Sequence, residues 1–129
     1  MRVVFDTNVF VSALVFPGGR ADDALQRVIE GKDTLIASKA IIDELLSVLA
    51  RKFARDREEL ARVAIFVSSL AEIVDPDEAL SVLSDQPDNR ILECALAGSA
   101  EAVVTGDRAM LALEEFRGAR ILSLAEYVG

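Results

Sequence analysis

The chain has 129 residues, of which 52% are hydrophobic and 28% charged, and its 22 acidic and 14 basic side chains give a net charge of −8. This length and apolar content predict one folded domain spanning residues 1–129 rather than a disordered chain. The chain contains no histidine, which excludes Ser-His-Asp and Cys-His nucleophiles and imidazole zinc sites. Its single cysteine, Cys94, excludes an internal disulfide and a multi-cysteine metal site.

The N-terminal segment is apolar without resembling a secretory signal. Asp6 and Asn8 interrupt the run that starts at Met1, and no small-residue cleavage site follows it. Nothing approaches the ~20 apolar residues of a membrane span. Since a lone cysteine suits a reducing compartment, we expect a cytoplasmic protein with no membrane segment.

The first third of the chain alternates between strand and helix patterns. Val3–Phe5 is a short apolar run and predicts a buried strand. A helix is predicted over Asn8–Val15, ended by the Pro-Gly-Gly at 17–19, and another over Asp22–Glu30. Thr34–Ala37 predicts the second strand.

The middle of the chain predicts two longer helices. Ser38 is a suitable N-cap for a helix that continues to about Phe53, and Asp56 for one that continues to about Leu70. Glu72–Asp75 predicts a weak third strand, and a short helix is expected over Asp77–Leu83.

The last third repeats the alternation after a turn-rich segment at Ser84–Asp88. Asn89–Ala97 predicts a helix and Ala102–Thr105 a fourth strand. Gly106 and Asp107 start the next helix. A short strand over Arg120–Leu122 and a helical turn complete the chain.

Strands that alternate with helices imply right-handed crossovers and a parallel sheet covered on both faces. We therefore expect an α/β fold, a three-layer α/β/α sandwich with a central parallel sheet of four to five strands. Ligands of such sheets bind outside the carboxyl ends of the strands.

Four acidic residues are predicted to meet at that edge of the sheet. Asp6 ends the first strand, Asp107 follows the fourth, Asp88 begins the helix that leads into the fourth, and Glu44 lies on the helix after the second. Converging carboxylates repel one another, so a cation among them is expected. Oxygen ligands without histidine favour Mg²⁺ or Mn²⁺, and such a site suits phosphodiester hydrolysis.

Each of these acids also has a structural interpretation. Aspartates at strand ends commonly cap turns or helices, and Asp85 competes with Asp88 for the same place. Glu44 borders the apolar stripe of its helix, whereas the adjacent Asp43 points further toward solvent. Glu93 lies three residues after Arg90, where a surface ion pair is the default, although it could also edge the acidic cluster.

The net charge argues against a nucleic-acid partner, because phosphates are neutralised by Lys and Arg. Local basic groups can reverse that argument. Arg90 and Arg108 lie near the predicted acidic site, and a second basic cluster comprises Arg51, Lys52, Arg55 and Arg57.

Three segments together resemble a known family. They are VVFDTNVFVSAL (residues 3–14), IIDELLSVLARKF (41–53) and DNRILECALAGSAEAVVTGDRAML (88–111). In this order, and at family length, they resemble the PIN-domain (PilT N-terminus) ribonucleases. The similarity is greatest to the prokaryotic branch of VapC-like toxin components of toxin–antitoxin systems.

The resemblance implies an endoribonuclease that depends on Mg²⁺ or Mn²⁺ and hydrolyses RNA. Its acidic quartet, both catalytic and metal-binding, would be Asp6, Glu44, Asp88 and Asp107. Asn8 and Thr105 match polar positions that support the acids, and Glu93 matches a position that is often acidic in this branch. The family also implies a homodimer and a cognate antitoxin protein as partners.

Two other classes of protein compete with this interpretation. A receiver-like signalling domain has a similar length and sheet, but it requires a lysine after the last strand, and the only lysines here are Lys32, Lys39 and Lys52. A dehalogenase-like phosphatase would also require a downstream lysine, which this chain lacks, and an aspartate in place of Asn8. The remaining alternative is a non-cleaving PIN-fold module that binds or assembles with other molecules.

Overall fold

Two buried apolar runs form the centre of the sheet in the computed structural model, which describes residues 1–129. β1 (Arg2–Phe5) and β4 (Ala102–Val104) are parallel neighbours, with Val4 paired to Val103. From Val3 to Phe5 and from Ala102 to Val104, each side chain is at most 1% exposed. Burial on both faces of the sheet explains why these strands are continuously apolar.

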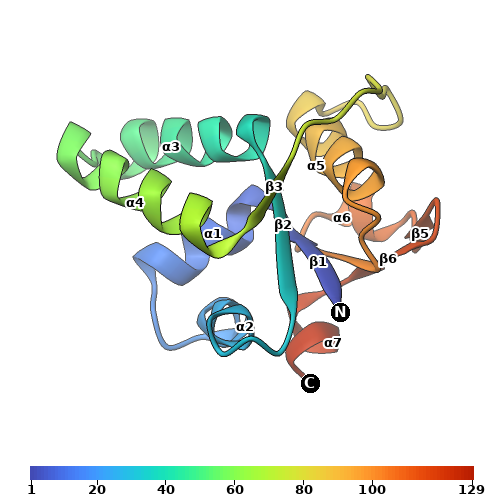
Figure 1. The fold of residues 1–129 in the computed structure, drawn as a ribbon, viewed down its shortest axis with the longest axis horizontal. Helices are drawn as coiled ribbons and strands as arrows, with labels where there is room; N and C mark the ends of the chain where they lie inside the picture. Colours follow the sequence, from blue (N-terminus) through green and yellow to red (C-terminus); the bar gives the residue numbers. More distant parts are fainter.

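The sheet has six strands in the order β3-β2-β1-β4-β6-β5 (Figure 1). β2 (Thr34–Ser38) and β3 (Glu72–Val74) extend it on one side of the centre, and β6 (Ala119–Leu122) on the other, all in parallel. The predicted three-layer α/β/α sandwich with a parallel sheet is confirmed. The sheet is larger than predicted by one edge strand, β5 (Glu115–Phe116), which is antiparallel to β6.

β5 was not predicted because two residues are too short to show an alternating pattern. It forms a hairpin with β6 through Arg117 and Gly118, which have φ angles of 46° and 90°. Positive φ at both central residues matches the right-handed twist of a tight hairpin. The Arg-Gly pair was therefore the available signal for this strand.

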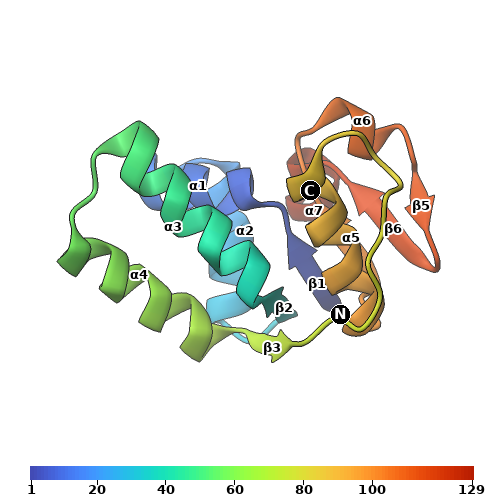
Figure 2. The same cartoon turned by 90° about the horizontal axis from the view of Figure 1, so that it is seen from above.

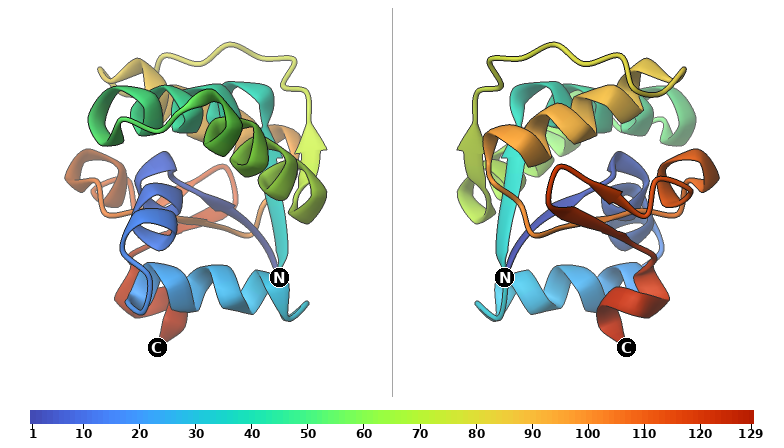
Figure 3. Two further views of the ribbon diagram at one scale, coloured as in Figure 1. Left: turned by 90° about the vertical axis from the view of Figure 1, so that its left-hand side faces the viewer. Right: turned by 90° about the vertical axis from the view of Figure 1, so that its right-hand side faces the viewer.

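Helices cover both faces of the sheet (Figure 2). One face is covered by α1 (Thr7–Val15), α2 (Arg20–Ile29), α3 (Lys39–Phe53) and α4 (Arg57–Leu70). The other is covered by α5 (Gln86–Ala97). α6 (Arg108–Leu111) follows β4, and the last helix, α7 (Leu124–Val128), packs beside α2 (Figure 3). None of the helices combines the length and the apolar character that crossing a membrane requires.

The predicted caps of the two long helices are confirmed. The Ser38 hydroxyl accepts a hydrogen bond from the Ile41 N–H at 3.3 Å, at the start of α3. The Asp56 carboxylate accepts one from the Glu59 N–H at 2.9 Å, at the start of α4. These bonds satisfy N–H groups that have no partner within the helix.

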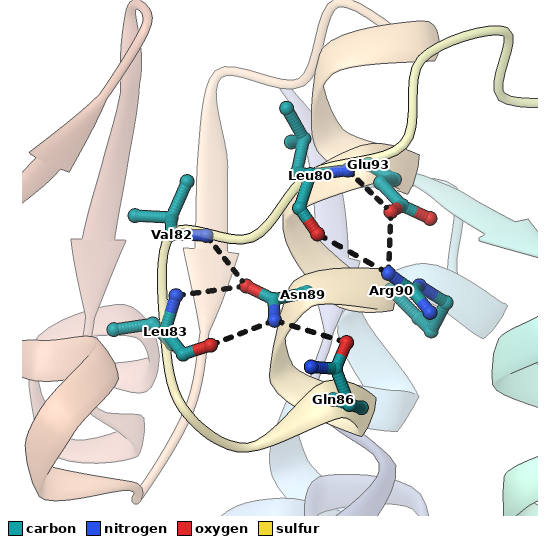
Figure 4. Close-up of polar contacts among 7 residues, drawn as sticks. All are labelled: Leu80, Val82, Leu83, Gln86, Asn89, Arg90 and Glu93. Atoms are coloured by element: carbon teal, nitrogen blue, oxygen red, sulfur yellow. Dashed lines mark hydrogen bonds and ion pairs between the residues drawn. The ribbon is translucent and has the colours of Figure 1, made fainter.

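The helix predicted over 77–83 is wrong: residues 75–85 form a loop without regular structure. The N–H groups that a helix would pair internally are bonded by side chains of α5 instead (Figure 4). Asn89 Oδ1 accepts from the N–H groups of Val82 and Leu83 at 3.0 and 2.9 Å, and Glu93 Oε2 accepts from the Leu80 N–H at 2.8 Å. Tertiary contacts therefore replace the local helical bonds.

α5 begins three residues earlier than predicted, at Gln86 rather than Asn89. Asp85 occupies the N-cap position and Pro87 lies in the first turn, where its missing N–H has no helical partner in any case. Asp88 therefore lies within the first turn of α5 and does not begin the helix.

The chain reverses its direction across the sheet between β1 and β4. It runs from β1 outward through β2 to β3, then returns to place β4 on the other side of β1. Such a switch point opens a crevice at the carboxyl ends of the two strands. Asp6 directly follows β1, and Thr105 directly follows β4.

Candidate active site

Asp6 is held at the switch point by β4. Its N–H donates to the Val104 carbonyl at 2.9 Å, and its side chain is buried, with 5% exposed. Asp6 occupies the N-cap position of α1, yet its carboxylate makes no capping hydrogen bond. Instead Oδ2 accepts a hydrogen bond from the Thr105 hydroxyl at 2.6 Å. The capping interpretation thus does not account for this carboxylate.

Thr105 connects Asp6 with Asp107. Its side chain is completely buried, and its Oγ1 accepts a hydrogen bond from the Asp107 N–H at 3.0 Å while donating to Asp6. Asp107 in turn caps α6, because its Oδ2 accepts from the Met110 N–H at 2.8 Å. This cap uses only one carboxylate oxygen of Asp107, so the other oxygen is not needed for the cap.

Burial raises the pKa of the Asp6 carboxyl above its usual value. The Thr105 hydroxyl and the Asn8 backbone favour the ionised form and reduce this rise, whereas the charge of Asp107 adds to it. Asp6 therefore combines the desolvation of a buried acid with hydrogen bonds that support its charge.

Asp88, in the first turn of α5, lies near Asp6 and Asp107 at the switch point of the sheet. It is buried, with 7% exposed, and makes no hydrogen bond that would stabilise its charge. Burial, followed by the negative charges of Asp107, Asp85 and Asp6, raises the pKa of Asp88 to about 7. These charges show that Asp6, Asp88 and Asp107 are close enough to repel one another. Asp85, the alternative to Asp88, is exposed at the helix terminus.

Glu44 comes from a different element, α3, than these three carboxylates. It is half-buried on α3, makes no hydrogen bond or ion pair, and does not contribute to the pKa of Asp88. It lines a cavity of about 300 Å³ between the first turns of α3 and α5, together with Thr7, Pro87 and Arg90. The adjacent Asp43 is more exposed, as predicted, and pairs with Lys39 at 2.7 Å.

The two remaining predicted residues have different surroundings. Asn8 is exposed on the first turn of α1, and its contribution to Asp6 comes from its backbone. Glu93 forms the predicted ion pair with Arg90, at 2.7 Å, but it is buried rather than at the surface. Its carboxylate also binds the Leu80 N–H (Figure 4), so Glu93 anchors the 75–85 loop.

Asn89 is the residue of this region that sequence reasoning missed. It is completely buried and uses both ends of its amide: besides its two acceptor bonds, Nδ2 donates to the Leu83 carbonyl at 2.8 Å (Figure 4). The available signal was an amide residue in the first turn of a helix, directly after a turn-rich segment. Asn89 fixes the first turn of α5 to the loop and thereby positions Asp88.

The donor set fits a divalent ion chemically, although it is not arranged as a finished metal site. Asp6, Asp88 and Asp107 offer only oxygen ligands, and their mutual repulsion would be relieved by a cation. No group of three or more acidic, histidine or cysteine side chains has the geometry to hold a metal ion. Binding an ion would thus require side-chain movement at this edge.

Comparisons with known proteins agree with this fold. A family model described as PIN domain matches residues 2–109. The uncharacterized protein MJ1680 of Methanocaldococcus jannaschii is 30% identical over 119 residues, which are 89% of this chain and 76% of that protein.

Two solved structures are similar over nearly their whole length. VapBC-1 from nontypeable Haemophilus influenzae has a TM-score of 0.68 at 15% identity, covering 97% of this chain and 99% of that chain. VapBC2 from Rickettsia felis, bound to a DNA fragment from their promoter, has a TM-score of 0.64 at 16% identity, covering 95% and 98%. At these identities the similarity concerns the fold alone.

Proposed function

We propose that this chain, which belongs to the PIN domain family, is an endoribonuclease that hydrolyses RNA phosphodiester bonds with Mg²⁺ or Mn²⁺. The observation that supports this most is the placement of three buried or half-buried aspartates at the switch point of the sheet. Protein interiors rarely hold unpaired carboxylates together without a functional reason. Asp6, Asp88 and Asp107 are also the residues that match the acidic positions of the family.

In this proposal the metal would be held by Asp6, Asp88 and Asp107, with Glu44 as the fourth acid. A bound Mg²⁺ or Mn²⁺ would supply an activated water and would balance negative charge on the phosphodiester oxygens. Glu44 is free of other partners on α3, across a cavity from α5, so no existing bond has to break for it to join the site.

The remaining residues of the site act on the acids. Thr105 orients Asp6 through its hydroxyl, and through the same atom it holds the backbone of Asp107, the N-cap of α6. Asn8 supports the charge of Asp6 from the first turn of α1. Arg108, exposed on the turn after Asp107, offers positive charge to the RNA backbone at an otherwise acidic edge.

The proposal is tested by cleavage of single-stranded and structured RNA in Mg²⁺ or Mn²⁺. Asp6→Asn preserves the volume of the side chain and is expected to reduce the rate more than about 100-fold, exceeding the effect typical of a residue that only supports a metal ligand. Asp75→Asn, at an exposed position after β3, is the matched control and should retain full activity. Equal rates for wild type and Asp6→Asn, or no cleavage by folded protein in any metal, would overturn the proposal.

We further propose that the enzyme is the toxin of a toxin–antitoxin pair, acting in the cytoplasm as a homodimer held inactive by its antitoxin. The sequence resemblance and the similar folds of two VapBC proteins support this assignment. Expression of the wild-type chain alone should arrest growth, and Asp6→Asn should not. Co-expression with the product of an adjacent small gene should restore growth and yield a stable complex. Growth that is unaffected by active enzyme contradicts the toxin assignment without affecting the nuclease assignment.

One observation favours a second candidate, a PIN-fold module that binds RNA or protein without cleaving. No three acids are arranged to hold a metal in this structure. The two candidates differ in their response to Mn²⁺. A nuclease should be stabilised by Mn²⁺ through Asp6, whereas a non-cleaving module should show neither that stabilisation nor RNA cleavage.

A further inference from the structure

The first turn of α5, which carries Asp88, lacks the usual contacts that hold the start of a helix. Its N-cap residue Asp85 makes no side-chain capping bond, and Pro87 has no N–H to donate. The backbone bond that closes the turn, from the Asn89 N–H to the Asp85 carbonyl, is long at 3.3 Å. By contrast, α3, α4, α6 and α7 each begin with a side chain that accepts a backbone N–H. Another contact must therefore fix this turn of α5.

The Asn89 side chain supplies that contact. Its amide is completely buried, and it bonds to the preceding loop on both of its ends (Figure 4). Oδ1 accepts from the N–H groups of Val82 and Leu83 at 3.0 and 2.9 Å. Nδ2 donates to the Leu83 carbonyl at 2.8 Å and to Gln86 Oε1 at 3.4 Å. Since an amide has two donors and two acceptor positions, these four bonds use its full capacity to join α5 to the 75–85 loop.

The position of Asp88 depends on the backbone that carries it. Unlike the carboxylates of Asp6 and Asp107, that of Asp88 accepts no hydrogen bond from a neighbouring donor. The negative charges of Asp107, Asp85 and Asp6 also repel it. Its place among these acids is therefore determined by the first turn of α5, in which it directly precedes Asn89. Without the bonds of Asn89, this repulsion would move Asp88 away from the other acids.

The 75–85 loop has a second anchor that does not involve the first turn of α5. One turn further along the helix, Glu93 accepts a hydrogen bond from the Leu80 N–H at 2.8 Å, and the Leu80 side chain is buried in the core. A further ion pair, between Glu78 and Arg117 at 3.1 Å, is exposed on both sides and contributes little. The loop is therefore a fixed support against which the Asn89 amide holds the helix start.

From these contacts we propose that Asn89 is a positioning residue that sets the affinity of the acidic site for its divalent ion. It acts through the backbone of α5, by holding Asp88 beside Asp6 and Asp107, and its own buried side chain contacts neither the ion nor the RNA. The 75–85 loop thereby controls the metal affinity of a site to which it contributes no ligand. This inference rests on the proposed function for the presence of the metal, and it adds the contact that preorganises the site.

The first test measures the Kd for Mn²⁺ by calorimetry in folded protein. Asn89→Leu keeps the volume of the side chain and removes its four bonds, so Mn²⁺ should bind about 10- to 100-fold more weakly, the range for residues that orient a metal ligand. Leu80→Ala is the matched control, because it loosens the packing of the same loop but leaves the Asn89 bonds in place. It should change the Kd less than about twofold. Equal Kd values for wild type and Asn89→Leu, or equal weakening in both variants, would overturn the positioning role.

The second test uses the wild-type protein and needs no substitution. If release of the Asn89 bonds lowers the metal affinity, bound metal must in turn oppose their release, because the two equilibria are linked. Saturating Mn²⁺ should therefore slow hydrogen exchange of the Val82 and Leu83 N–H groups about tenfold or more. The Glu59 N–H, which the Asp56 side chain accepts at the start of α4, is the reference and should be unaffected. Unchanged exchange at Val82 and Leu83 in the Mn²⁺-bound protein would overturn the positioning role.

RNA cleavage separates this inference from the proposed function. Saturating Asn89→Leu with Mn²⁺ should restore most of its cleavage rate, and a rate that stays low would overturn a role in metal affinity. Cleavage by an enzyme whose Mn²⁺ affinity is independent of Asn89 would overturn the positioning role and leave the nuclease proposal intact. Mn²⁺ binding that depends on Asn89, without cleavage of any RNA, would support the positioning role and overturn the nuclease. A folded wild type that binds no Mn²⁺ would overturn both.

Discussion

One buried aspartate lies at the amino end of the parallel sheet and two lie at its carboxyl end, and their surroundings are opposite in charge. At the amino end, Asp33 precedes β2 and accepts hydrogen bonds from the Met1 amine at 2.8 Å, from Arg27 Nε at 2.9 Å and from the Tyr127 hydroxyl. At the carboxyl end, Asp88 is buried to a similar extent but faces the charges of Asp107, Asp85 and Asp6.

The pKa values of Asp33 and Asp88 differ accordingly. Burial by itself raises the pKa of Asp33, but hydrogen bonds from the Met1 amine, Tyr127 and Arg27 lower it to about 2. Burial and negative neighbours raise the pKa of Asp88 to about 7. The carboxylate at one end thus stabilises the fold, whereas the carboxylates at the other end destabilise it when ionised. This contrast indicates that the carboxyl end is built for a ligand and the amino end for stability.

The largest effect on stability is expected from Asp33→Ala. This change leaves the Tyr127 hydroxyl and the positive Arg27 and Met1 groups without their acceptor. We expect a loss of about 2–3 kcal/mol, less than for a fully buried ion pair because Arg27 and the amine are each more than a third exposed. Urea denaturation at neutral pH measures this loss, and a change below about 0.5 kcal/mol would contradict the role of Asp33.

At the other end, Thr105→Val should destabilise the protein by about 1–2 kcal/mol, because Asp6 Oδ2 and the Asp107 N–H both lose their partner. We also expect about a 10- to 100-fold loss of cleavage, since Thr105 orients a predicted metal ligand. Thr105→Ser retains the hydroxyl and is the matched control. If Thr105→Val and Thr105→Ser have the same activity, the hydroxyl has no role in the site.

Mn²⁺ is expected to stabilise the protein through the acids at the carboxyl end of the sheet and not through Asp33. Millimolar Mn²⁺ should raise the melting temperature of the wild type, corresponding to about 1–2 kcal/mol if the concentration exceeds the Kd about tenfold or more. Asp33→Ala should show the same increase, because it leaves the acids unchanged, whereas Asp6→Asn should show a smaller one. An unchanged melting temperature in the wild type argues against a metal site.

The smallest effect, of opposite sign, is expected from Asp88→Asn in protein freed of divalent ions. The folded-state pKa of Asp88 lies above its unfolded value near 4, so the stability of the fold falls as the pH rises from about 4 to about 7 and stays at the lower level above that. Asp88→Asn should therefore stabilise the protein by about 1 kcal/mol at pH 8 and have little effect near pH 4. Asp85→Asn, at the exposed neighbouring position, should have a smaller effect. For Asp33 the sign is reversed, and its stabilisation should be lost as the pH falls from about 4 toward 2.

Much of the fold follows from local patterns in the sequence. The continuously apolar runs at β1 and β4 identify the central strands, and the caps Ser38 and Asp56 locate the starts of α3 and α4. The loop at 75–85 could not be predicted in the same way. Its backbone is held by Asn89 and Glu93, which follow it in the chain, and local helical periodicity contains no information about these contacts.

The candidate site, like the fold, is predicted in part by the sequence and decided in part by tertiary contacts. The order of strands and helices is sufficient to place Asp6 and Asp107 at one edge, because parallel strands end at the same edge. The sequence does not distinguish Asp85 from Asp88, since that choice depends on where α5 begins. It also does not reveal that Thr105 joins Asp6 and Asp107, or that Arg90 has an unpartnered nitrogen beside a cavity.

The acidic excess of this chain acquires its meaning only in the tertiary structure. The sequence alone determined the α/β class, the absence of histidine chemistry and the family resemblance, because these depend on residue identity and local spacing. Only the structure decided which of the 22 acidic residues lie beside positive or hydrogen-bond-donating groups and which lie beside other carboxylates. A carboxylate acquires its pKa from neighbours that are distant in the sequence: Asp33 from Tyr127, and Asp88 from Asp6.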